Sequence, residues 1–160
     1  MTLATPDETG VERHRAREAA LQLLYQWEVG RIDQAALDEA NESYWDGHPG
    51  PKLRRTFAEA LVVGTTGHLD TIDPLLEASA DNWRLSRMAV VDRLIMRLAV
   101  YELLYTGTPS AVVINEALEL GKTFGGDHTV RFVNGVLDSI SRSLQSGDLP
   151  RNGEGPRTSG

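Results

Sequence analysis

Several features that mark other classes of protein are absent from this chain of 160 residues. It has no cysteine, which excludes a disulfide framework, a thiol nucleophile and a cysteine-ligated metal. No run of about 18 apolar residues occurs, so we expect no membrane-spanning segment. No stretch alternates strongly between apolar and polar residues, as a half-buried strand would, and the N-terminus lacks the order of a secretory signal. We therefore expect an all-α protein in a reducing cytoplasm.

Catalytic and metal-binding motifs are also missing. Gly121-Lys122-Thr123 resembles the end of a phosphate-binding P-loop, but that loop needs a glycine where Glu116 stands and a strand before it. The four histidines are scattered along the chain and suggest no zinc site. No serine has the context of a nucleophile. We therefore expect no enzymatic activity, no cofactor and no metal.

The net charge of −7 argues against a surface covered with phosphate-binding residues. Any nucleic-acid site must then be local, and binding through it alone should be weak.

The most informative stretch, residues 109–144, predicts two helices joined by a Gly-Gly break. Apolar residues recur at helical spacing on both sides of Gly125 and Gly126, which can supply the left-handed geometry at a helix end. Asp127 or Thr129 can cap the second helix. On that helix Phe132 falls at the edge of the apolar stripe and Arg131 on the far side. Such a border offers a contact to a partner.

Five further helices are expected before this pair. They cover residues 11–30, 33–44 with Asp33 as cap, 52–69, 70–80 and 88–105, with a Gly/Pro-rich loop at 45–51. The helix at 88–105 is apolar on most of its circumference and should be central. The sequence thus predicts a single compact domain at 11–145, with about seven helices in two packed subbundles. Residues 1–10 and 146–160 are expected to be disordered.

Charged residues on two of these helices allow alternative interpretations. Arginines crowd the first turns of the helix at 11–30, either as a solvated face or as a binding surface. On the same helix Leu21 and Tyr25 point away from the main stripe, as a second buried side or as a contact patch. On the central helix Arg97 is expected on an exposed face with Arg93, and Glu102 in the core, where a carboxylate needs donors or a proton.

Three segments together resemble the bacterial NusB family. They are RHRAREAALQLLYQWEVG, VDRLIMRLAVYELLY and VINEALELGKTFGGDHTVRFVNGVLDSI. The resemblance covers about residues 12 to 140. It implies an all-helical, cytoplasmic transcription antitermination factor that pairs with ribosomal protein NusE. The pair binds the boxA element of nascent single-stranded RNA and works with the transcription elongation complex, with no membrane partner.

The resemblance also implies roles for individual residues. Residues matching the family's RNA-binding positions are Arg13, His14, Arg15, Arg17, Arg97, Asp127, His128, Arg131 and Phe132, and those matching NusE-contacting positions are Tyr25 and Asp92. Two positions depart from the family pattern: His14 stands where arginine is frequent, and His128 where an acidic residue is common. The pairing of Arg131 with Phe132 suits single-stranded RNA, whose bases stack on aromatic side chains beside basic ones.

Two other classes of function compete with this interpretation. The helical N-terminal domain of an rRNA cytosine methyltransferase shares the fold, but such a chain would continue into a cofactor-binding α/β domain. A helical adaptor that binds protein only is the other alternative. RNA binding measured with and without NusE separates that adaptor from an RNA-binding factor.

Overall fold

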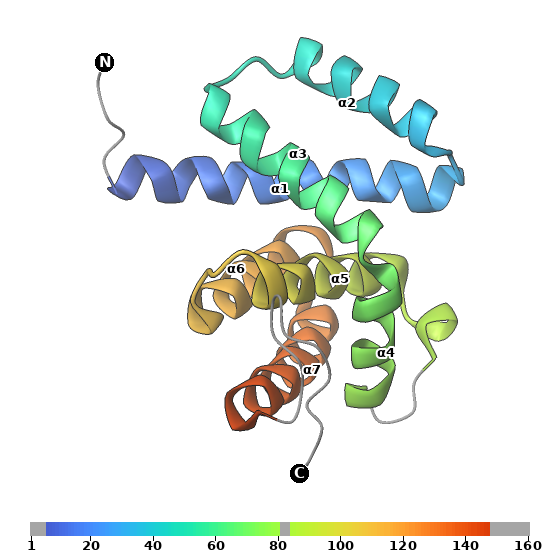
Figure 1. Ribbon diagram of the computed structural model, residues 1–160, viewed down its shortest axis with the longest axis vertical. Coiled ribbons are helices and arrows are strands. Elements are labelled where there is room, and N and C mark those ends of the chain that lie inside the picture. Colours follow the sequence, from blue (N-terminus) through green and yellow to red (C-terminus); the bar gives the residue numbers. More distant parts are fainter. Residues whose placement is uncertain (1–5, 81–83, 148–160) are drawn as a thin grey trace. The chain divides into compact units, whose positions relative to one another are not determined.

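The structure, a computed structural model, describes residues 6–80 and 84–147 (Figure 1). Within those ranges it contains seven α-helices, one short 3₁₀ helix and no strand. The chain divides into two compact units, residues 1–66 and 67–160. The expected all-α fold with two helical subbundles is confirmed. Of the described residues, no helix is long and apolar enough to cross a membrane.

The first unit consists of α1 (Pro6–Gly30), α2 (Gln34–Gly47) and α3 (Lys52–Gly67), which runs to the boundary between the units. Its core includes Ala16, Ala19, Trp45 and Ala58, with Phe57 packed against them. The alanines let the neighbouring helices approach α1 closely, because they add no side chain beyond Cβ.

Two boundaries in this unit differ from the sequence prediction by three residues or more. Helix α1 begins at Pro6 rather than Val11, because a proline is tolerated in the first turn, where its missing N–H would have no partner. Helix α2 continues to Gly47 instead of ending at residue 44. Trp45 extends it because its indole is buried and donates a hydrogen bond to Asn41 Oδ1 (3.0 Å) one turn earlier. The cap at Asp33 is confirmed, since its carboxylate accepts a hydrogen bond from Ala36 N–H (2.8 Å).

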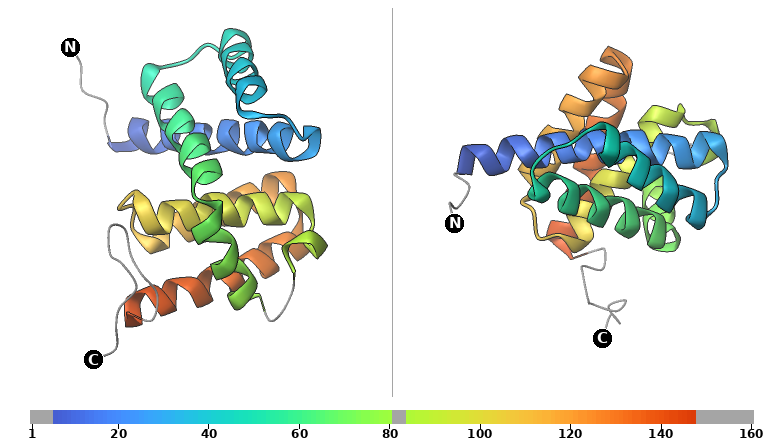
Figure 2. Two further views of the ribbon diagram at one scale, coloured as in Figure 1. Left: turned by 45° about the vertical axis from the view of Figure 1, so that its right-hand side comes forward. Right: turned by 90° about the horizontal axis from the view of Figure 1, so that it is seen from above.

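The second unit contains α4 (Leu69–Ser79), the 3₁₀ helix η1 (Leu85–Arg87), α5 (Val90–Tyr105), α6 (Ser110–Phe124) and α7 (Asp127–Ser146). Helix α5 contacts α4, α6 and α7 (Figure 2). Its buried side chains occupy most of its circumference, as expected of a central helix, and Glu102 is among them. Residues 1–5 and 148–160, which hold most of the tails expected to be disordered, lie outside the described residues.

Arg93 explains why α5 begins at Val90 rather than Met88. Its guanidinium donates hydrogen bonds to the carbonyl oxygens of Leu85 (2.8 Å) and Met88 (3.2 Å), which belong to η1 and the residue after it. The side chain is therefore buried. The prediction that it lies on an exposed face is wrong. Arg93 gives a donor to the Met88 carbonyl just before α5 and a second donor to the Leu85 carbonyl, which also accepts from Met88 N–H (3.1 Å).

Candidate nucleic-acid interface

The basic segment of α1 is exposed at Arg13 and Arg15. His14, between them, is half-buried, and its Nε2 lies 3.5 Å from Glu18 Oε1 one turn later. The guanidinium carbon of Arg13 lies over the ring of Phe57 in α3, 5.3 Å from the ring centroid. Two arginines of this segment can therefore reach a phosphate.

Arg17 does not fit the role predicted for it. Only 3% of the residue is exposed, and its guanidinium carbon also lies 5.3 Å from the Phe57 centroid. The Arg17 side chain is therefore held inside the first unit, with its guanidinium against the Phe57 ring. The prediction that Arg17 is free to contact phosphate is wrong for this structure.

The turn between α6 and α7 depends on two glycines in different ways. Gly126 has φ +135°, which side-chain-bearing residues rarely adopt. Gly125 has an ordinary φ, but a Cβ there would lie 2.5 Å from Thr129 Oγ1. Its N–H donates to Gly121 O (2.9 Å), as does that of Gly126 (2.8 Å). The predicted Gly-Gly break is confirmed, although only Gly126 requires positive φ.

Four residues predicted to face RNA lie in the first two turns of α7. Asp127, His128 and Arg131 are exposed, and Phe132 is half-buried. The carboxylate of Asp127 is favourable at the N-terminus of the helix, where the backbone N–H groups carry partial positive charge. The Arg131 side chain thus reaches solvent, and the Phe132 ring does so in part.

The predicted side-chain cap of α7 is wrong. Gly126 precedes the helix and no side chain caps it. Thr129, one of the expected caps, is buried and donates its hydroxyl hydrogen to Asp92 Oδ1 of α5 (2.6 Å). The α6–α7 turn is thereby tied to the central helix.

The same hydrogen bond corrects the role predicted for Asp92. Only 3% of the residue is exposed, so its carboxylate is not presented to a protein partner. Asp92 lies in the first turn of α5, where a carboxylate is stabilised by the helix dipole. Thr129 supplies a donor that a buried carboxylate needs. Asp92 is a structural residue in this arrangement.

Arg97 is also buried, with 8% of the residue exposed, so its predicted contact with RNA is not available. Its Nε donates to Asp73 Oδ1 (2.9 Å) and its second terminal nitrogen to Asp73 Oδ2 (3.0 Å). This two-pronged geometry between guanidinium and carboxylate is strong and directional. Arg97 therefore joins α5 to α4.

Tyr25 keeps the exposure that a partner contact needs, with 46% of the residue exposed. Leu21, one turn earlier, is buried. Of the two alternatives for this pair, Leu21 fits the second buried side, and Tyr25 fits the contact patch.

The NusB family model matches residues 14–142. The chain belongs to the NusB family. Transcription antitermination protein NusB of Anaeromyxobacter dehalogenans is 49% identical over 135 residues, which covers 82% of this chain and 92% of that protein. The NusB of Solibacter usitatus is 42% identical over 139 residues, which covers 86% of this chain and 94% of that protein.

Solved structures of NusB proteins agree with this membership. The match to T. maritima NusB has a TM-score of 0.74 at 32% identity and covers 92% of this chain and 100% of that one. A crystal structure of antitermination factors NusB and NusE in complex with dsRNA has a TM-score of 0.73 at 26% identity, covering 82% of this chain and 97% of that one. Because the family consists of non-enzymatic antitermination factors, the expectation that the chain is not an enzyme is confirmed.

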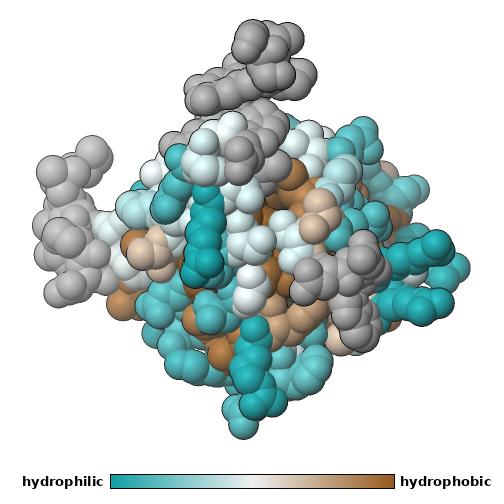
Figure 3. Space-filling model, turned by 90° about the horizontal axis from the view of Figure 1, so that it is seen from below, coloured by the Kyte–Doolittle hydropathy of each residue, from teal (hydrophilic) through white to brown (hydrophobic). Residues whose placement is uncertain are grey.

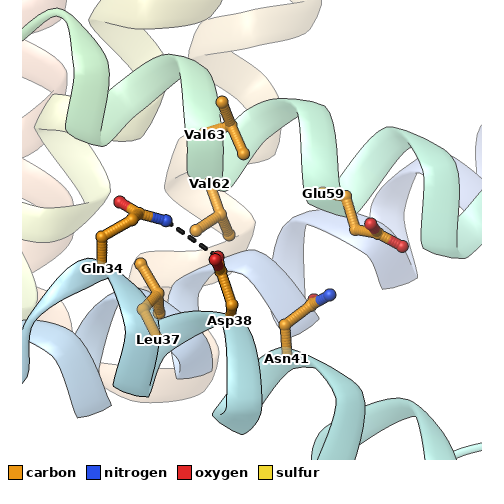
Figure 4. A pocket seen from close by; sticks show the side chains of 7 residues that line it. All are labelled: Gln34, Leu37, Asp38, Asn41, Glu59, Val62 and Val63. Atoms are coloured by element: carbon orange, nitrogen blue, oxygen red, sulfur yellow. Dashed lines mark hydrogen bonds between the residues drawn. The ribbon is translucent and has the colours of Figure 1, made fainter.

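A shallow pocket of about 70 Å³ in the first unit of this NusB-family chain lies apart from the predicted residues. It is lined by α2 and α3 residues, namely Gln34, Leu37, Asp38, Asn41, Glu59, Val62 and Val63 (Figure 4). Gln34 donates a hydrogen bond to Asp38, one turn later on α2 (2.9 Å). In the described ranges no group of three acidic, histidine or cysteine side chains could hold a metal.

On the face in Figure 3, strongly hydrophilic side chains flank hydrophobic ones that reach the surface.

Sequence reasoning missed Phe57 and Glu12, which belong to the same neighbourhood as the basic segment. Glu12 Oε2 accepts a hydrogen bond from Arg54 Nε (2.6 Å), and Glu12 Oε1 one from the Arg54 terminal nitrogen (3.3 Å). These hydrogen bonds hold the pKa of the Glu12 carboxyl below its ordinary value. The partners stand 42 residues apart, so no local pattern could have paired them.

Proposed function

We propose that this chain is an RNA-binding transcription antitermination factor that pairs with ribosomal protein NusE, binds boxA-type single-stranded RNA and supports processive rRNA transcription with the elongation complex. The observation that carries the proposal is the exposure of Arg13, Arg15, His128 and Arg131 in segments that lie within or beside the NusB family match. The solved complex of NusB and NusE with dsRNA supports NusE and RNA as the classes of partner.

The exposed arginines of α1 contact the phosphate backbone in this proposal. Arg13 and Arg15 carry permanent charges on long side chains, and the guanidinium matches the geometry of phosphate oxygens. Such contacts set affinity and carry little sequence information.

The first two turns of α7 supply contacts to bases. The Phe132 ring is partly exposed, so an unstacked base can stack on it, and Arg131, the preceding residue, is exposed. His128 and Asp127 add polar groups at the same end of the helix. These contacts favour single-stranded RNA, because paired bases are not free to stack on a side chain.

The proposed NusE surface includes Tyr25 and excludes Asp92, because only Tyr25 is exposed. A net charge of −7 suits a basic ribosomal protein, since opposite charges speed association and disfavour wrong partners. It also explains why RNA binding without NusE should be weak.

A gel-shift experiment tests the proposal directly. Labelled boxA-type RNA, a permuted sequence of the same composition, and a boxA duplex are each mixed with this protein, with NusE, and with both. We expect the strongest shift for single-stranded boxA RNA with both proteins. If the two proteins associate but shift no RNA beyond what NusE shifts alone, the chain is a protein-only adaptor and the proposal is wrong.

A further inference from the structure

The ring of Phe57 in α3 lies against two arginines of α1. The guanidinium carbons of Arg13 and Arg17 are each 5.3 Å from the ring centroid, within the range in which a cation is attracted to an aromatic face. Arg13 is exposed, whereas Arg17 is buried. One aromatic ring thus contacts both a buried guanidinium and a guanidinium that reaches solvent.

Phe57 is itself held in place. It is half-buried and packs against the core cluster of Ala16, Ala19, Trp45 and Ala58. In a packed core a side chain keeps one rotamer, because alternatives would clash or leave voids. The ring is therefore a fixed platform and not a mobile surface group.

The backbone around Arg13 is fixed as well. Glu12, the preceding residue, is clamped to Arg54 of α3 by two hydrogen bonds of 2.6 and 3.3 Å. Arg54 and Phe57 are three residues apart on α3, so they lie on one face of that helix. This clamp also offsets the negative charge of Glu12 beside the basic segment.

We infer that Phe57 is a positioning residue for RNA binding, which holds the Arg13 guanidinium over its ring so that the N–H groups can donate to a phosphate. The inference rests on the proposed function, because Arg13 is there a phosphate contact. A free arginine side chain loses much rotamer entropy when it binds, and a guanidinium already held over a ring loses less.

The size of the expected effect follows from the strength of the contact. A cation–aromatic contact at an exposed site contributes about 0.5–1 kcal/mol, which corresponds to about a two- to five-fold change in affinity. Phe57→Leu removes the ring and retains an apolar side chain, and Phe57→Tyr retains the ring. We therefore expect Phe57→Leu to weaken RNA binding by about two- to five-fold. Phe57→Tyr should bind RNA as tightly as the wild type.

A double-mutant cycle separates positioning from general stability. Affinities for boxA-type RNA in the presence of NusE are measured for the wild type, Phe57→Leu, Arg13→Ala and the double variant. If Phe57 acts through Arg13, the double variant binds no more weakly than Arg13→Ala. Equal weakening by Phe57→Leu in both backgrounds, or wild-type affinity of Phe57→Leu, overturns the inference while the proposed function stands. Wild-type affinity of Arg13→Ala removes Arg13 from the proposed function, and the inference with it.

Arg55→Ala is the matched control. Arg55 is on α3 two residues before Phe57, and its guanidinium donates to Glu59 Oε1 (2.6 Å) and Glu42 Oε1 (2.7 Å). This variant removes a charge from the same helix without touching the ring, so RNA affinity should change less than for Phe57→Leu. An equal loss would mean that disturbing α3 in general lowers RNA affinity, against the inference.

A measurement on the unmodified protein keeps the inference testable if Phe57→Leu fails to fold. In the NMR spectrum, the Arg13 side-chain protons should be shifted upfield by the ring, and the Arg13 Nε–H should be more rigid than that of Arg15. On addition of boxA-type RNA with NusE, Arg13 should keep its ring shift. A ring shift that is absent, or lost on binding, overturns the inference.

Discussion

Thr129 at the start of α7 donates a hydrogen bond of 2.6 Å to the buried carboxylate of Asp92 at the start of α5. The two residues are 37 positions apart, so this contact joins the central helix to the turn that presents the proposed RNA-contacting residues. It also makes Asp92 important for stability.

Replacing Thr129 with valine tests this contact, because valine keeps the shape and removes the hydroxyl. The Asp92 carboxylate then loses a buried donor, and the free energy of unfolding should fall by about 1–3 kcal/mol. Urea denaturation measures the change. Thr123→Val is the control, since the Thr123 hydroxyl donates to Glu119 O (3.1 Å) at an exposed position. Equal free energies of unfolding for the two variants would show that the hydrogen bond to Asp92 stabilises the fold no more than an exposed one does.

Arg97→Ala should lower stability without altering RNA recognition. The change leaves the Asp73 carboxylate, 24% exposed as a side chain, without its two-pronged partner, at a cost of about 1–3 kcal/mol. Arg142→Ala provides the control, because that side chain is 78% exposed and pairs with Asp138 on the same helix. If Arg97→Ala instead remains as stable as the wild type and binds RNA weakly, Arg97 belongs in the RNA site after all.

The Glu12–Arg54 pair should make stability depend on pH. Hydrogen bonds from Arg54 lower the pKa of Glu12 below its ordinary value of 4.5. The pair therefore stabilises the fold above pH 4.5 and loses this effect as the pH falls through the lowered pKa. Arg54→Met should consequently destabilise the protein at neutral pH, and the difference from the wild type should shrink as the pH is taken below that value. A difference that stays constant with pH would contradict the pairing.

Phe132→Ala should weaken RNA binding with little change in its salt dependence, because a stacked base contributes about 1–3 kcal/mol without involving charge. Fluorescence anisotropy with boxA-type RNA and NusE measures the affinity. Thermal melting provides the check, since Phe132 is half-buried. A variant that melts several degrees lower yet binds RNA normally when folded would show that Phe132 only completes the core.

The helices themselves could be read from the sequence because they depend on local spacing. The recurrence of apolar residues defined α5, α6 and α7, and Asp33 marked the start of α2 through its cap. At the end of α2 and the start of α5, side-chain hydrogen bonds of Trp45 and Arg93 accompany the difference from the predicted bounds.

The roles of Arg17, Asp92 and Arg97 could not be read correctly because their partners are distant in the sequence. Asp73 lies 24 residues before Arg97, and Phe57 lies on a different helix from Arg17. One signal was available, however. A helix that is apolar on most of its circumference buries whatever charged residues it carries, so Asp92 and Arg97 should have been expected to be paired inside the protein.

The dependence of RNA affinity on salt tests the central claim, that exposed arginines of α1 contact the RNA backbone. The affinity of the complex with NusE for boxA-type RNA is measured at a series of salt concentrations for the wild type and for Arg15→Ala. The account predicts that the slope of log K against log salt becomes shallower by about 0.7, the value for one phosphate contact on a single strand, while the preference for boxA over the permuted RNA stays the same. An unchanged slope together with unchanged affinity would contradict it.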